Sequence, residues 1–556
     1  MCNFASNRLE MKRLSMLLVA LLALPFLMVA QQVENHDYKS AFESAYQACP
    51  DIPQGLLEAI SFANTQCHHL TDADYTIPAD DPTAMPRAYG MMGLVRDGKG
   101  VFRENLKTVA MLSGYSEEEI IEDPAVNVLA YAKACVKVAS RLGIRSRKAE
   151  DYRPVIEALS ELPMNGKKDE LPMKMMLYSV YSRLDVDLRV MFGEDYPLLS
   201  GDGMSFSKET DYPNAIWNPA PDCNFEERTK EVSAVVIHYT EGSYAGCISW
   251  FQNCDSQVSA HYVIRSSDGQ VTQMVRERDK AWHAGSANGY TIGVEHEAYG
   301  DIISFFTPEM YASSADLMRS ICSRYDAING YRTFCTDTLD DGTALDSGLH
   351  DLGGEGYCLQ IKGHQHYPNQ THTDPGPFWN WNHYYKLINE GTPIIHLGGS
   401  GVTNGEFNHE NYGNDERLIW VIEGNPGSRI KLDFSSFDLE TDYDFLWIYD
   451  GDNVYAPQIG RWNTMSPGSV TSSGNALCVE FRSDCATTTS GWRAVWTVDG
   501  VSEVDEDFDP AMEPCQVTYF DVMGREVPEN QMQRGTYIAR FTRLSDGKSW
   551  IKRIIR

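Results

Sequence analysis

The spacing of hydrophobic residues changes along the chain, and this succession constrains the fold more than any other feature. Residues 36–200 carry apolar side chains at helical spacing, most clearly in the run 124–142. Residues 223–392 alternate short β-branched runs, such as 232–239, with the amphipathic helical pattern of 308–325. Residues 396–500 hold only short strands separated by Gly, Asn and Pro turns. A chain of 556 residues with these patterns predicts several domains: one helical, one α/β and one β-sandwich.

Composition marks the boundaries between these segments. Gly and Pro residues predict a linker at 201–222, and an acidic stretch predicts another at 501–513. The last segment, 514–556, has the pattern of a small β unit. A basic flank followed by an apolar run predicts a cleavable signal peptide at 1–30. A membrane anchor is the alternative, but Pro25 interrupts the run and no second spanning segment follows, so no stable transmembrane span is expected.

The net charge of -31 limits the partners of the chain. It argues against nucleic acid and against anionic membranes, both of which attract basic surfaces. The predicted signal peptide indicates an exported protein that crosses the periplasm to the outer surface or the medium. Of the 13 cysteines, only Cys2 lies in the signal, so disulfides are expected in the oxidising compartment. Neighbours in sequence are the candidate pairs: Cys247 with Cys254, and Cys478 with Cys485.

The α/β segment holds a set of side chains suited to a metal. His238 ends the predicted strand 232–239, His364 follows a glycine, and Asp374 lies ten residues further on. Two imidazoles and one carboxylate suit zinc and leave a fourth position for water. A zinc ion in such a site activates its water for hydrolysis at neutral pH.

The stretches around these residues resemble a known family. Five pieces occur in the order of the zinc-dependent N-acetylmuramoyl-L-alanine amidases, a family that includes the peptidoglycan recognition proteins: 236–240, 258–264, 281–285, 292–295 and 363–377. The resemblance implies an α/β domain with a mixed sheet flanked by helices. It also implies hydrolysis of the amide bond between N-acetylmuramic acid and L-alanine of bacterial peptidoglycan by zinc-activated water. A non-catalytic peptidoglycan-binding protein is the alternative.

The resemblance also assigns roles to individual residues. It implies that His238, His364 and Asp374 bind zinc and that Glu295 transfers the proton. His372 stands where many members carry a basic residue and would stabilise the developing oxyanion. Trp282, His283 and Tyr239 are the predicted substrate-binding residues. The remaining candidates are expected to be structural or weaker alternatives: His261, His366, His296 and Glu297.

The helical segment 36–200 resembles a lysozyme-like transglycosylase domain, in altered form. Asn64 and Thr65 stand where that family has its catalytic Glu-Ser pair, and residues 90–93 replace its Gly-Leu-Met-Gln motif. An asparagine cannot protonate a glycosidic oxygen. We therefore expect an all-α domain that binds glycan without cleaving it.

Two further resemblances concern the C-terminal part. The segment 396–500 resembles a CUB domain, carried by the runs 430–434, 437–440, 443–451 and 481–484. Many such domains bind calcium, and Glu440, Asp444 and Asp484 match the ligand positions, with a plain solvated loop as the alternative. The segment 514–556 resembles the C-terminal sorting domain of the type IX secretion machinery, which implies that this machinery is a partner.

Overall fold

The structure is a computed structural model that describes residues 38–81, 83–164, 166–201, 210–300, 302–335, 348–399, 401–499, 515–520, 527–528, 532, 536–543 and 549–555. The predicted signal peptide 1–30 and the acidic linker 501–513 lie outside these residues. Within the described part of the chain, no helix combines the length and apolarity that crossing a membrane needs.

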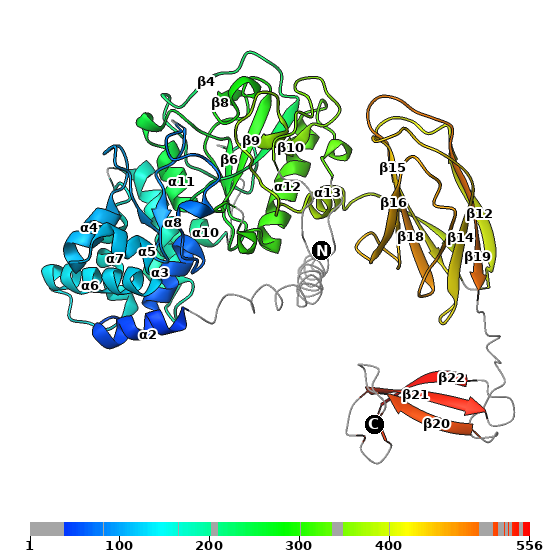
Figure 1. Ribbon diagram of the computed structural model, residues 1–556, viewed down its shortest axis with the longest axis horizontal. Coiled ribbons are helices and arrows are strands. Elements are labelled where there is room, and N and C mark those ends of the chain that lie inside the picture. The colour runs from blue at the N-terminus through cyan, green and yellow to red at the C-terminus, as the bar shows by residue number, and fades with distance from the viewer. Residues whose placement is uncertain are drawn as a thin grey trace, which may run out of the picture.

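The first segment is mainly helical (Figure 1). Its longest helix, α6, begins where the Asp123 side chain accepts hydrogen bonds from the Ala125 and Val126 amides, and it ends at Gly143, whose backbone is left-handed. The helices are α2 (Lys39–Ala48), α3 (Leu56–Thr65), α4 (Asn105–Ser113), α5 (Glu117–Glu122), α6 (Pro124–Leu142), α7 (Arg153–Ser160), α8 (Lys167–Tyr181), α9 (Leu188–Phe192) and α10 (Tyr196–Ser200).

The all-α expectation for this segment needs a correction, because it also contains a small antiparallel pair, β1 (Ala88–Tyr89) with β2 (Leu94–Val95). Gly90 and Gly93 in the connecting turn have positive φ angles of 68° and 61°. A Cβ at Gly93 would lie 2.8 Å from the Asn64 Cβ, so only glycine allows the turn to pack on α3.

A six-stranded mixed sheet forms the centre of the second segment, in the order β10-β5-β9-β6-β7-β3. Strands β10, β5, β9 and β6 all run in the same direction, whereas β7 is antiparallel to β6. The elements are β3 (Ala215–Trp217), β4 (Phe225–Glu227), β5 (Ala234–Tyr239), α11 (Tyr244–Phe251), β6 (Tyr262–Ile264), β7 (Val271–Gln273), β8 (Asp279–Ala281), β9 (Thr291–His296), α12 (Pro308–Arg324), β10 (Ile361–Gly363) and α13 (Trp381–Ile388). Helices pack on both faces, as Figure 1 shows, which is the expected α/β arrangement.

Part of the linker predicted at 201–222 belongs to the sheet of the α/β domain instead. Residues 210–222 contain β3, which pairs in parallel with β7 at the edge of the sheet. Tyr212, just before β3, is buried in the core of the α/β domain. The prolines read as linker signals flank an edge strand, a position that tolerates them.

The third segment is a sandwich of two sheets, in the orders β11-β13-β18-β15-β16 and β12-β19-β14-β17. Its core is formed by apolar side chains that alternate along the strands, with Trp492 and Leu446 fully buried. The strands are β11 (Ile394–Gly398), β12 (Asn404–Glu410), β13 (Arg417–Glu423), β14 (Arg429–Asp438), β15 (Phe445–Tyr449), β16 (Gln458–Trp462), β17 (Ser469–Thr471), β18 (Ala476–Arg482) and β19 (Gly491–Asp499). A separate antiparallel sheet follows, made of β20 (Cys515–Phe520), β21 (Thr536–Arg543) and β22 (Ser549–Ile555).

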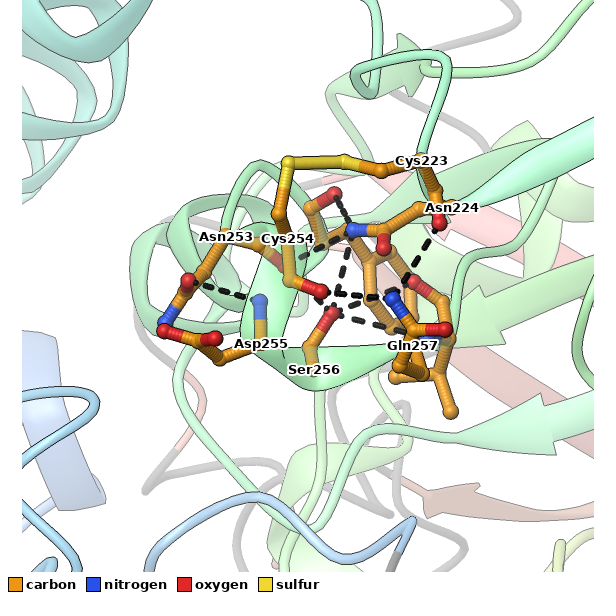
Figure 2. Close-up of a disulfide and its surroundings, with 9 residues drawn as sticks. Cys223, Asn224, Asn253, Cys254, Asp255, Ser256 and Gln257 are labelled. Carbon is orange, nitrogen blue, oxygen red and sulfur yellow. Dashed lines mark hydrogen bonds between the residues drawn. A yellow bond between two sulfur atoms is a disulfide. The ribbon is translucent and has the colours of Figure 1, made fainter.

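The disulfides do not join sequence neighbours. Cys254 pairs with Cys223, 31 residues away, as Figure 2 shows, and Cys247 is buried as a free thiol in α11. Asn224 supports this bridge by donating to the carbonyls of Phe251 and Asn253. Cys485 pairs with Cys358 rather than with Cys478, which is buried in β18. The neighbour pairs predicted from sequence are therefore wrong, because Cys247 and Cys478 point into hydrophobic cores.

Candidate active site

Neighbouring strands bring the first two candidate residues together. His238 at the end of β5 lies directly opposite Glu295 in β9 in the parallel register. Side chains at paired positions of adjacent strands point to the same face of a sheet. The side chains of His238 and Glu295 therefore lie on the same face. His296, one residue on, points the other way and hydrogen-bonds Ser314 in α12.

His364 and Asp374 approach from the segment after β10. Nδ1 of His238 lies 2.7 Å from Oδ2 of Asp374, and Nδ1 of His364 lies 3.0 Å from Oδ1 of the same carboxylate. One donor atom from each of these buried residues lies within 4.8 Å of the others. The ring centroids of His238 and His364 lie 4.6 Å apart. Nitrogen and carboxylate donors converging at this separation fit a zinc ion, and the geometry therefore supports the residues chosen from sequence.

Burial sets the charge states of this cluster. It lowers the pKa of His238 to about 4, so the imidazole is neutral at pH 7, the form that binds metal. Burial alone would raise the pKa of Asp374, but His364 and His238 beside it hold that pKa well below its usual range. The site thus presents a neutral His238 imidazole beside the ionised Asp374 carboxylate.

Glu295 is a buried acid at the edge of the cluster. It is 8% exposed, and its Oε2 has no hydrogen-bond partner among the described residues. Burial, with the Asp374 carboxylate nearby, raises the pKa of Glu295 well above its ordinary value. A carboxyl group with a raised pKa and a free oxygen can accept a proton and release it again at neutral pH.

Glu297, the alternative base, is occupied elsewhere. Its Oε1 accepts from the Tyr244 amide at 2.7 Å, and its Oε2 accepts from the Ser266 amide at 2.9 Å. The carboxylate therefore ties the start of α11 to the turn after β6. Both oxygens are used for structure, which leaves Glu295 as the candidate for proton transfer.

The spare histidines hold the surroundings of the site. His261 contacts Arg228 and accepts from the Gly293 amide, whereas His366 accepts from the Gly363 amide and packs on Phe334. These contacts agree with the structural role expected for both.

His372 lies beside the cluster, and its ring centroid is 4.9 Å from that of His364. His283 is closer than expected for a cleft-lining residue, because its Nδ1 lies 3.0 Å from Nε2 of His238. A Cβ at Gly293 would lie 2.6 Å from the His283 ring, so this glycine in β9 makes room for it. His283 therefore orients His238 directly, a contact that the sequence did not indicate.

The other two predicted substrate-binding residues lie apart from the cluster. The Trp282 indole donates to Glu226 in β4 at 3.3 Å. Tyr239 is 3% exposed and packs with Tyr75 and Ala298 at the border of the helical segment. The alternation of side chains along a strand explains why Tyr239 lies away from the cluster, because the residue after His238 in β5 must point to the opposite face of the sheet.

Sequence reasoning missed Gln370, whose Oε1 lies 2.7 Å from Nε2 of His364. Its amide nitrogen donates to the carbonyls of Ala284 and Pro368. The amide therefore fixes the His364 ring from the side opposite Asp374. An amide is not a typical zinc ligand, so the residue type gave no indication of a role in the site. The sequence indicated Gln370 only through its position between His364 and Asp374.

A second acidic group lies in the sandwich, where carboxylate oxygens of Glu440, Asp444 and Asp484 lie within 4.8 Å of one another. Asp444 is fully buried and accepts hydrogen bonds from the Tyr412 hydroxyl and the Asp484 amide. Burial raises its pKa to about 6, and the neighbouring carboxylates add to this effect. Oε2 of Glu440 has no partner among the described residues. Oxygen donors in this arrangement suit a calcium ion.

Comparisons with known proteins address the α/β segment first. The family model described as N-acetylmuramoyl-L-alanine amidase matches residues 228–377, the range that contains all the clustered residues. The N-acetylmuramoyl-L-alanine amidase A of Achromobacter lyticus is 44% identical over 182 residues, which are 33% of this chain and 97% of that protein. The chain belongs to the N-acetylmuramoyl-L-alanine amidase family. The family prediction made from five ordered motifs is thereby confirmed.

The sandwich of this amidase matches the CUB domain model over residues 400–496. Human cubilin is 29% identical over 132 residues, which are 23% of this chain but only 4% of cubilin. Among solved structures, the Staphylococcus aureus hydrolase AmiA in complex with its ligand is 16% identical to this chain. The match covers 37% of this chain and 91% of the AmiA chain, with a TM-score of 0.23. The predicted CUB region is confirmed by the model match.

Proposed function

We propose that this protein hydrolyses the amide bond between N-acetylmuramic acid and L-alanine in bacterial peptidoglycan, with zinc held by His238, His364 and Asp374. The observation that carries the proposal is the convergence of these donors beside the buried Glu295. Membership of the amidase family supports the bond type. When bound, zinc supplies a Lewis acid that polarises the scissile carbonyl and lowers the pKa of water.

The residues of the chain perform the proton transfer. Glu295 takes a proton from the attacking water through its free Oε2 and passes it to the departing amine of L-alanine. His283 and Gln370 keep the His238 and His364 rings in fixed orientations, which preserves the donor arrangement during turnover. His372, beside His364, donates to the oxygen on which negative charge develops.

Digestion of purified peptidoglycan tests this proposal. The protein is incubated with and without a zinc chelator, and the products are identified by mass spectrometry. We expect free L-alanine amino termini that disappear with chelation and fall by about 100- to 10,000-fold in Glu295→Gln. Glu309→Gln, the same chemical change at an exposed position of α12, serves as the matched control with unchanged activity. Intact peptidoglycan that retains the protein would instead identify a non-catalytic binding protein.

We infer that the sandwich binds calcium through Glu440, Asp444 and Asp484. The unpartnered oxygen of Glu440 and the burial of Asp444 support this assignment, because uncompensated carboxylates are costly to bury together. Calorimetric titration is expected to give one calcium per chain and none in Asp444→Asn. Heat of equal size in the variant would contradict the assignment.

We further propose that the chain is exported and that the C-terminal sheet β20-β21-β22 is recognised by the type IX secretion machinery. The predicted signal peptide and the separate β unit support this route. Sequencing the N-terminus of protein recovered from the culture medium tests it, with cleavage before Gln31 expected. Protein retained inside cells with an intact N-terminus would contradict it.

For the helical segment we propose a lysozyme-like domain without glycosidase activity, because Asn64 replaces the acid that cleavage requires. The Asn64 side-chain amide donates to the Met92 carbonyl, and the backbone carbonyl of Asn64 accepts from the Tyr299 hydroxyl of the α/β domain. Release of new reducing ends from purified wall glycan would contradict this proposal. Glycan binding by this segment stays a prediction.

A further inference from the structure

One loop of the helical segment reaches the amidase domain next to the site. We call it the junction loop and define it as residues 75–81 and 83–88. Glu241, three residues after His238, accepts hydrogen bonds from the amides of Thr76 at 2.7 Å and Ile77 at 3.1 Å. The Thr76 hydroxyl lies 2.7 Å from both the Glu241 carboxylate and the Tyr239 hydroxyl. The loop is therefore fastened to the strand that carries His238.

The junction loop holds its own shape. The Tyr75 hydroxyl accepts from the Ala88 amide at 2.8 Å and donates to the Ala88 carbonyl at 2.6 Å, which closes the two ends of the loop. Arg87 lies over the Tyr75 ring at 4.8 Å and donates to the Ile77 carbonyl at 2.7 Å. A compact loop with joined ends can present a side chain in a fixed place.

The side chain presented to the site is Asp81. Its Oδ1 accepts from the Thr83 amide at 2.8 Å and from the Thr83 hydroxyl at 2.5 Å. This leaves Oδ2, which lies 3.5 Å from Nε2 of His372. The side chains of Asp81 and His372 are 21% and 17% exposed, so the contact is largely shielded from water. A carboxylate beside one ring nitrogen fixes the rotation of the ring and therefore the direction in which the other nitrogen points.

We propose that Asp81 of the helical segment is a positioning residue that orients His372, so that the junction loop completes the amidase site. The inference rests on the proposed function, because His372 matters for turnover only if the amidase reaction takes place. It gives the helical segment a role in the reaction that is independent of glycan binding.

Kinetics on a soluble muramoyl-peptide, with the full chain, test the proposal. Asp81→Asn is expected to lower kcat by about 10- to 100-fold while KM, zinc content and melting temperature stay unchanged. Thr83→Ala, which frees Oδ1, is expected to lower kcat less, and Asp81→Glu is expected to recover part of the loss. Asp80→Asn is the matched control, because Asp80 is the exposed neighbour with the same charge. An Asp81→Asn variant that matches the control, or that loses activity through KM or zinc content, overturns the proposal.

A second measurement separates this inference from the proposed function. The ring of His372 can be followed by NMR of chains labelled at histidine Cε1, with the signal assigned from its absence in His372→Gln. Displacement of this signal in Asp81→Asn but not in Asp80→Asn supports the positioning role, even if the wild-type chain has no amidase activity. An unchanged signal in both variants overturns the role whatever the activity.

Discussion

The amidase domain is joined to its two neighbours in different ways. On the N-terminal side, one continuous hydrophobic cluster contains helices of the first segment together with α11 and strand β6 of the amidase domain. Trp250 of α11 packs edge-on against Phe102 with ring centroids 5.2 Å apart. Figure 1 shows these two segments in contact along this border. The two units therefore share a core, which makes them dependent on each other for folding.

On the C-terminal side, a disulfide and polar contacts join the amidase domain to the sandwich. The disulfide between Cys358 and Cys485 connects a loop of the amidase domain to the sandwich. Arg332 contacts both oxygens of Asp415 at 2.6 Å, and Arg482 donates to the Thr333 carbonyl at 3.0 Å. The hydrophobic core of the sandwich contains only residues of the sandwich itself. Such a domain can fold by itself, and the contacts then fix its orientation.

The largest effect is expected at the shared core. Trp250→Ala should lower the free energy of unfolding of the joined helical and amidase units by about 3 to 5 kcal/mol, because it leaves a cavity where a 5% exposed indole was packed. Urea denaturation followed by circular dichroism measures this loss as one cooperative transition. Met111→Ala, at a position 70% exposed in α4, is the control, with a change below about 0.5 kcal/mol. Separate transitions for the two units would show that they do not share a core.

An intermediate effect is expected at the disulfide. Cys358→Ser with Cys485→Ser should lower the stability of the sandwich by about 2 to 4 kcal/mol and leave amidase turnover unchanged. Scanning calorimetry should show the sandwich transition moving alone. Cys223→Ser with Cys254→Ser is the matched control and should destabilise the amidase domain instead. A joint shift of both transitions would mean that the sandwich unfolds together with the amidase domain.

The smallest effect is expected from calcium. About 10 mM calcium should stabilise the sandwich by about 1 to 3 kcal/mol, as for a ligand at about 10 to 100 times its Kd. The helical and amidase transition should not move. Thermal melts of wild type and Asp444→Asn measure the difference. If calcium stabilised Asp444→Asn as much as the wild type, the ion would bind at a site other than Glu440, Asp444 and Asp484.

Much of the site could be predicted from the sequence, because its residues belong to local patterns. The strand 232–239 has a recognisable β pattern, and alternation within 290–297 puts Glu295 and His296 on opposite faces. His364 and Asp374 lie in one short motif, so the family resemblance was sufficient to single out the cluster for which we propose a zinc ion. The family and the CUB region followed from the same kind of evidence and are confirmed by the comparisons.

Other features depended on which distant segments meet. Cys254 pairs with Cys223, Asp81 faces a histidine 291 positions later, and Tyr239 packs against the helical segment. The strand β3 lies in a region with the composition of a linker, and only its pairing with β7 makes it part of the sheet.

The sequence by itself predicted the amidase family and the CUB region, since these are encoded by local periodicity and short motifs. The metal donors and the proton-transfer acid that it named stay predictions. The tertiary structure alone decided the disulfide partners, the shared core and the approach of Asp81 to His372. Remote segments of the chain come together when folding buries their apolar surfaces, and the disulfides and polar contacts between them form as a result. No local sequence pattern specifies which surfaces will meet.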